Sequence, residues 1–188
     1  PDLDTVAVRR VLHQLAAAKR PVILAGAGVL RARATADLVQ LAEMLEVPVI
    51  ASWRRPDVFP NEHPLYLGMT GHASPATVRE RLRAADFLLV LGCRLSEITS
   101  YEYSVPARGQ AWAHVDLEPR ANVPGVPGPR LSVTADTRSF LRSAVERLRA
   151  GALEARRGRR DRTQPPRLEA RSARDRPARI RRTCSRAP

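Results

Sequence analysis

The sequence predicts an α/β fold: a Rossmann-like doubly wound parallel sheet of five or six strands, with a disordered basic C-terminal tail. Short, almost entirely apolar runs such as residues 22–25 and 87–91 alternate with segments whose apolar residues recur at helical spacing. Strands that are apolar along their whole length are typical of a parallel sheet buried on both faces. Because a tight hairpin cannot join parallel strands, the intervening helices are expected to be the crossovers.

Individual elements are expected where a start or stop signal meets one of these patterns. Asp4 and Asp136 precede segments with apolar residues at helical spacing and are therefore expected to cap helices. Ser74 is expected to cap the next helix, with Pro75 as its first residue. Residues 53–71 are rich in Pro, Asn, Asp and Gly and are expected to form a long loop. The remaining expected elements are a helix at residues 38–45 and strands at residues 22–25, 47–51, 87–91, 111–116 and 130–134.

Positive charge is concentrated at the C-terminal end of the chain. The 188 residues carry a formal net charge of +13, and residues 149–188 hold 14 arginines against 4 acidic residues. Because residues 150–188 show no sustained apolar period, we expect an Arg-rich disordered tail or linker behind a domain at residues 1–149. An arginine-rich stretch attracts nucleic-acid phosphates, but this one lacks the aromatic residues that stack on bases. We therefore do not expect nucleic acid to be the partner.

Membrane and secreted proteins are classes that the sequence does not favour. The longest apolar run, residues 87–91, is too short to cross a bilayer, and no secretory signal opens the chain. Two cysteines, Cys93 and Cys184, provide no disulfide framework, which favours a cytoplasmic location. Because the chain begins with Pro1 and not with Met, we expect it to be a piece of a longer protein.

Common catalytic sequence motifs are absent from the chain. The sequence has no Gly-x-Ser-x-Gly, Walker A, Cys-x-x-Cys or His-Glu-x-x-His pattern, so we expect no catalytic residue and no metal site. The segment Gly26-Ala27-Gly28 follows a strand and is either a phosphate cradle or simply a tight strand-to-helix turn. Arg31 replaces the third glycine of a dinucleotide fingerprint. Asp116, at a strand end, either binds ribose hydroxyls or anchors a loop.

Five blocks of sequence, taken together, carry a family resemblance. The most telling is Phe59-Pro60-Asn61-Glu62-His63-Pro64-Leu65 followed by Leu67-Gly68-Met69-Thr70-Gly71. The other four are residues 20–29, 41–49, 84–95 and 114–119. In order and spacing, across residues 5–149, these blocks resemble the central domain of thiamine-diphosphate-dependent enzymes of the acetolactate synthase and benzoylformate decarboxylase-like family.

The resemblance implies a role within a larger enzyme. In that family the first domain supplies a glutamate that activates the cofactor, and the third holds its diphosphate and a divalent metal with a Gly-Asp-Gly…Asn motif, which this chain lacks. The implied function is a non-catalytic central domain of a thiamine-diphosphate- and Mg2+-dependent 2-keto-acid carboligase or decarboxylase, a lyase or transferase. This chain alone is expected to be inactive and to brace the missing catalytic domains, in a homo-oligomer. The alternative is a free-standing nucleotide-binding Rossmann-like module without thiamine-diphosphate chemistry.

The resemblance also implies a candidate nucleotide site, because the central domain of acetolactate synthases holds FAD. Ser96-Glu97-Ile98 stands where those enzymes have Asp-Asp-Arg, and Ala135 stands where they have Gly. The candidate site could therefore hold FAD, another nucleotide or no ligand, and these alternatives stay open. A domain that braces the two catalytic domains is the favoured interpretation. The cofactor-binding residues carried over are Gly26, Ala27, Ser52, Trp53, Thr70, Gly71, His72, Gly92, Arg94, Asp116, Leu117 and Asp136.

Overall fold

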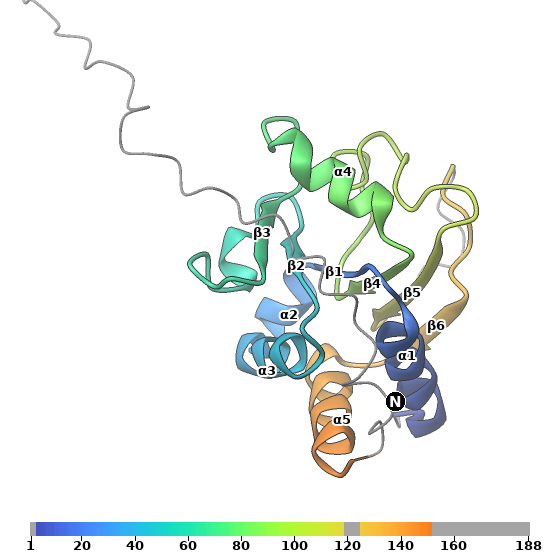
Figure 1. Ribbon diagram of the computed structural model, residues 1–188. Coiled ribbons are helices and arrows are strands. Elements are labelled where there is room, and N and C mark those ends of the chain that lie inside the picture. The colour runs from blue at the N-terminus through green and yellow to red at the C-terminus, as the bar shows by residue number, and fades with distance from the viewer. Residues whose placement is uncertain (1–2, 119–124, 152–188) are drawn as a thin grey trace, which may run out of the picture. The chain divides into compact units, whose positions relative to one another are not determined.

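The alternation of apolar runs and helical segments produces a six-stranded, all-parallel sheet with the strand order β3-β2-β1-β4-β5-β6. The structure is a computed structural model that describes residues 3–118 and 125–151 (Figure 1). The strands are β1 (Pro21–Ala25), β2 (Val49–Ala51), β3 (Tyr66–Met69), β4 (Phe87–Leu91), β5 (Ala111–Asp116) and β6 (Leu131–Thr134). The helices are α1 (Thr5–Ala17), α2 (Ala27–Arg31), α3 (Thr35–Leu45), α4 (Ala76–Ala84) and α5 (Thr137–Arg149), with a short 3-10 helix η1 at Pro56–Val58.

The predicted fold class is confirmed by this sheet. Strands β1 and β4 form its centre and pair in register from Pro21 opposite Phe87 to Ala25 opposite Leu91. Every β4 residue is at most 1% exposed, as expected for a strand covered on both faces. The predicted tail falls almost entirely on residues 152–188, which lie outside the described residues, so its disorder stays a prediction.

The two faces of the sheet are covered unequally. In β1, Ile23 and Ala25 pack with the apolar side of α1, α2, α3 and α5, whereas Val22 and Leu24 pack with α4 and the loops around it. Figure 1 shows α4 on one side of the sheet and the other four helices on the opposite side. The sheet is therefore doubly wound, with one face covered by a single helix in the described part of the chain.

Two expectations about local structure were wrong. The predicted loop at residues 53–71 contains η1 and the edge strand β3. This strand gave no apolar run because it is short, half-buried and interrupted by Gly68, whose φ is +108°. The helix predicted to start at Pro75, with Ser74 as its cap, begins instead at Ala76 with Pro75 as its N-cap, because the Ser74 hydroxyl donates to the Gly71 carbonyl at 2.7 Å. The predicted caps at Asp4 and Asp136 are confirmed, since each carboxylate accepts two backbone N–H groups.

A buried-strand register needs a fixed starting point, and Asp86 supplies it. The N–H groups of Lys19 and Arg20 donate to its two carboxylate oxygens at 2.7 and 2.8 Å. Hydrogen bonds to a charged acceptor are the stronger class, so this contact ties the start of β1 to the start of β4.

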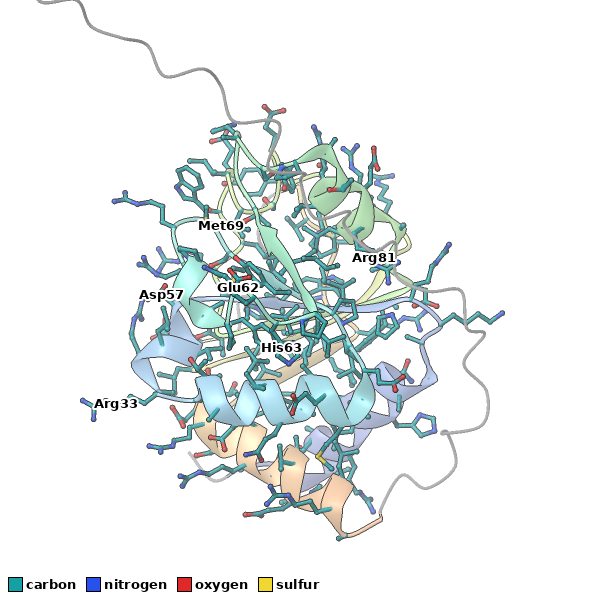
Figure 2. The ribbon with its side chains drawn as sticks, turned by 60° about the vertical axis from the view of Figure 1, so that its left-hand side comes forward. Arg33, Asp57, Glu62, His63, Met69 and Arg81 are labelled. Atoms are coloured by element: carbon teal, nitrogen blue, oxygen red, sulfur yellow. The ribbon has the colours of Figure 1, made fainter. Side chains whose placement is uncertain are left out.

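The segment before β3 is anchored to α3 by His63. The Leu65 N–H donates to Nδ1 of His63 at 3.1 Å, so for the neutral ring Nε2 carries the proton and donates to Oε1 of Glu43 at 3.2 Å. Phe59 packs edge-on against the imidazole ring with 5.0 Å between centroids. Figure 2 shows His63 above the helix that carries Glu43. This contact fixes the otherwise polar segment that leads into the edge strand.

The close approach of Gly28 to Gly92 yields a test of the packing. A Cβ at Gly28 would stand 2.6 Å from the Cα of Gly92, which is backbone and cannot rotate away. We expect Gly28→Ala to lower the free energy of unfolding by about 3 kcal/mol, the upper range for overpacking. Gly109→Ala is the matched control, because Gly109 has φ +80° and a Cβ added there would meet no atom within 4 Å; its left-handed backbone should cost about 1 kcal/mol. Urea unfolding measures both, and equal losses would contradict the packing argument.

Candidate functional site

The candidate nucleotide residues all lie at the carboxyl ends of strands or just after them. Because the six strands are parallel, these ends lie at one edge of the sheet, here called the carboxyl edge. Strand order reverses between β1 and β4, so the switch point lies between the turn at Gly26 and the residue Gly92. In doubly wound sheets a ligand binds in the crevice at this point. Whether these residues contact a nucleotide stays a prediction.

The turn at the switch point packs on its own chain. The Gly26 N–H donates to the Leu91 carbonyl at 3.0 Å, and the Gly28 N–H donates to the Gly92 carbonyl at 2.8 Å. A Cβ at Gly26 would lie 2.5 Å from the Gly92 oxygen and from the Cβ of Cys93. Both glycines are therefore required by this close contact, and their presence is explained without a ligand.

The space beside Gly71, after β3, is filled by an indole ring. Gly71 has φ +142°, and a Cβ there would collide with the six-membered ring of Trp53, which follows β2. Trp53 is half-buried, and Ser52 beside it is only 6% exposed. The structure thus brings two of the candidate residues, Trp53 and Gly71, into contact with each other.

A buried polar group lies between the ends of β2, β4 and β5. Burial raises the pKa of the Cys93 thiol to about 12; a hydrogen bond from the Ser52 side chain opposes this rise, and the Asp116 charge adds to it. Nε2 of His114 lies 3.2 Å from the Cys93 carbonyl oxygen and 3.9 Å from Oδ2 of Asp116. The Cys93 thiol is protonated at neutral pH, so this group offers no nucleophile.

Sequence reasoning did not anticipate this group. Cys93 and His114 were assigned only to strand patterns, and neither was a candidate site residue. The order of the strands could have predicted this group, because residues at the carboxyl ends of adjacent parallel strands become neighbours.

The other candidates are buried, engaged within the chain, half-buried in a helix or exposed to solvent. Thr70 is fully buried, and within the described residues its hydroxyl oxygen has no hydrogen-bond partner. Oδ1 of Asp136 accepts the N–H groups of Arg138 and Ser139, both at 3.0 Å, as the cap of α5. Ala27 is half-buried as the first residue of α2. The last three candidates, His72, Arg94 and Leu117, are exposed.

The carboxyl edge does not fit the pyrophosphate of FAD in this conformation. The amides of Gly26 and Gly28 are hydrogen-bonded within the chain, and the Trp53 ring covers Gly71. The Thr70 hydroxyl, at 0% exposure, is out of reach of a ligand.

Within residues 3–118 and 125–151, no cluster of three or more His, Cys, Asp or Glu side chains is arranged to hold a metal ion. Among the helices of the same residues, none has the length and apolar character needed to cross a membrane.

Burial of the Cys93 thiol should make both the stability of the domain and the reactivity of the thiol depend on pH. Because its folded-state pKa lies above the value of about 9 for a free thiol, the free energy of unfolding falls as the pH rises from about 9 towards about 12. In a Cys184→Ser chain, which retains only Cys93, alkylation at pH 9 should be roughly 100- to 1,000-fold slower than for the same chain unfolded in urea. Iodoacetamide labelling followed by mass spectrometry measures this. Equal rates before and after unfolding would show that the thiol is neither buried nor neutral.

Comparison with known proteins agrees with this architecture. The family described as thiamine pyrophosphate enzyme, central domain, matches residues 8–144. The chain is 36% identical over 156 residues to sulfoacetaldehyde acetyltransferase of Rhodobacter capsulatus, covering 81% of this chain and 26% of that protein. It is 28% identical over 142 residues to acetolactate synthase of Mycobacterium avium, covering 76% of this chain and 23% of that protein.

A solved structure shows the same arrangement. It is described as a thiamin diphosphate-dependent enzyme from Mycobacterium smegmatis, and it matches with a TM-score of 0.59 and 25% identity over 77% of this chain and 28% of that one. The chain thus spans about a quarter of the length of the curated relatives named above. The parallel sheet, the matched region and these relatives together show that the chain belongs to the family of thiamine pyrophosphate enzyme central domains.

Proposed function

We propose that this chain is the non-catalytic central domain of a thiamine-diphosphate- and Mg2+-dependent enzyme that joins or decarboxylates 2-keto acids. The family match and the acetolactate synthase relatives support this assignment. In the proposed parent enzyme, the cofactor and the metal ion are bound by the other domains. This chain contributes no step of the chemistry, in line with the neutral, buried thiol of Cys93 at its carboxyl edge.

The main support for a bracing role is the backbone contact at the switch point, between the turn after β1 and the end of β4. A domain that carries a nucleotide there needs amides that point at the phosphates. Here the amides of Gly26 and Gly28 donate to carbonyls at the end of β4. The contact instead joins the turn before α2 to the central strand, which makes the domain a stiff spacer.

Two further contacts support stiffness away from the switch point. The carboxylate of Asp86 ties the starts of β1 and β4, and the His63–Glu43 pair ties the segment before β3 to α3. A spacer between catalytic domains must hold their separation, because small displacements of catalytic groups are costly to rate. The proposed partners are accordingly the catalytic domains of the parent and further copies of it in a homo-oligomer. The proposed location is the cytoplasm, where the free thiol of Cys93 persists.

Calorimetric titration of the purified chain tests this proposal. Thiamine diphosphate with Mg2+ should give no saturable heat, and pyruvate should not be turned over, because the binding groups belong to other domains. FAD and NAD, which carry no terminal phosphate group, should likewise give no saturable heat, because the switch point is closed. Tight binding of thiamine diphosphate, or turnover of pyruvate by this chain alone, would refute the proposal.

The same titration decides between bracing and a nucleotide-binding module. One-to-one binding of FAD or NAD would favour the module. The arginines of residues 149–188 attract any polyphosphate; titrations are therefore repeated at about 0.3 M NaCl, where such attraction is screened. Tripolyphosphate serves as the control, since it carries the charge of a nucleotide without its base and sugar. Heat that tripolyphosphate reproduces counts as nonspecific and leaves bracing as the supported role.

A further inference from the structure

A hollow lies at the opposite end of the sheet from the carboxyl edge. It has a volume of about 440 Å³ and is lined by Arg10, His13, Gln14, Arg130 and Leu131. Arg130 directly precedes β6, so the hollow lies at the amino end of that edge strand. Figure 1 shows α1 beside β6, and the two elements pack together. The family match and the proposed function assign no role to this hollow.

The local structure brings its polar side chains to one place. Arg10, His13 and Gln14 are spaced i, i+3 and i+4 in α1, which puts them on one side of the helix. Val11 and Leu15 hold the opposite side in the core. The helix is therefore fixed by its apolar face, and its polar face is presented toward β6.

Arg130 is positioned by its backbone. Its N–H donates to the Trp112 carbonyl at 2.9 Å, which extends the pairing of β5 with β6 by one residue. Leu131, next in sequence, starts β6 and is half-buried. Two guanidinium groups from segments about 120 residues apart in sequence thus line one concave surface.

Among the described residues, the positive charges in this hollow lack acidic partners. No ion pair or side-chain hydrogen bond within this part of the chain engages Arg10, His13 or Arg130. Other surface arginines are engaged: Arg142 lies 3.8 Å from Asp37, and Arg149 donates to Gln40 at 2.9 Å. Neither α1 nor the sequence from 119 to 130 contains an Asp or Glu. Gathering like charges without a counter-charge is unfavourable, and a bound anion removes that cost.

We propose that this hollow binds a phosphate-type dianion, either inorganic phosphate or the phosphomonoester end of a small metabolite. The guanidinium groups of Arg10 and Arg130 donate to the phosphate oxygens, for which their forked N–H geometry is suited. The Gln14 amide is a further donor, and Leu131 offers an apolar wall to the rest of a metabolite. A volume of about 440 Å³ exceeds that of phosphate alone and falls in the range of small-molecule sites.

The test needs a local readout, because the C-terminal arginines also attract anions. The full chain is titrated at constant pH and ionic strength while the ring resonance of His13 is followed by NMR and assigned with His13→Gln. Inorganic phosphate should shift this resonance saturably. The His72 ring, which follows β3 at the carboxyl edge, should not respond.

Single variants connect the signal to the two guanidinium groups. Arg10→Ala and Arg130→Ala should each weaken phosphate binding at His13 by about tenfold, as expected for loss of a hydrogen bond to a charged group. Arg9→Ala is the matched control, because Arg9 is an exposed arginine of the same helix that does not line the hollow. All three side chains are exposed, so all three variants should keep the thermal midpoint of the parent chain.

Each outcome decides the proposal. Ribose 5-phosphate binding more tightly than phosphate would identify the ligand as a phosphomonoester, and equal binding would identify it as free phosphate. The proposal is overturned if His13 shows no saturable shift, if neutral ribose shifts it equally, or if Arg9→Ala weakens binding as much as the other two variants.

Discussion

Backbone packs directly on backbone where the turn after β1 meets the end of β4, and the arrangement of the carboxyl edge depends on this contact. The Gly28 N–H donates to the Gly92 carbonyl, and a Cβ at either Gly26 or Gly28 would collide with residue 92. The turn enters α2 only because these side chains are missing. Protein interiors are packed closely enough that one extra carbon atom here forces the two segments apart. The switch point of the sheet is consequently filled by the chain itself.

The same constraint explains the chemistry of the neighbouring residues. With the turn pressed against Gly92, the Cys93 side chain is sealed between Ser52 and the turn, and burial raises the pKa of its thiol. On the outer strands, Trp53 covers Gly71 in a comparable way. Because this edge is hydrogen-bonded and filled by its own chain, it favours a bracing role in a larger enzyme over a nucleotide-binding role. The hollow between α1 and β6 differs, because its charged groups face an open concave surface.

The sequence predicted most of the fold because its signals were local. Buried strands such as Phe87–Leu91 appear as apolar runs, and Asp136 precedes a helical period, so both were placed correctly. Strand β3 was missed because an edge strand of four half-buried residues with a glycine inside it lacks such a run. The Ser74 cap was wrong because the hydroxyl is engaged by Gly71 and Tyr101. Long-range contacts of this kind leave no periodic trace in a sequence.

For the candidate nucleotide site, the sequence could predict where the residues lie but not how they pack. Parallel topology places residues such as Trp53 and Asp116 at one edge, but whether the space between them is open depends on side-chain packing. The most direct measurement is amide hydrogen exchange at Gly28, with and without FAD. We predict slow exchange, comparable to that of the β4 amides and unchanged by FAD, because this N–H is hydrogen-bonded to Gly92 at 2.8 Å. Rapid exchange in the free chain, or protection that appears only when FAD is added, would contradict a switch point closed by its own backbone.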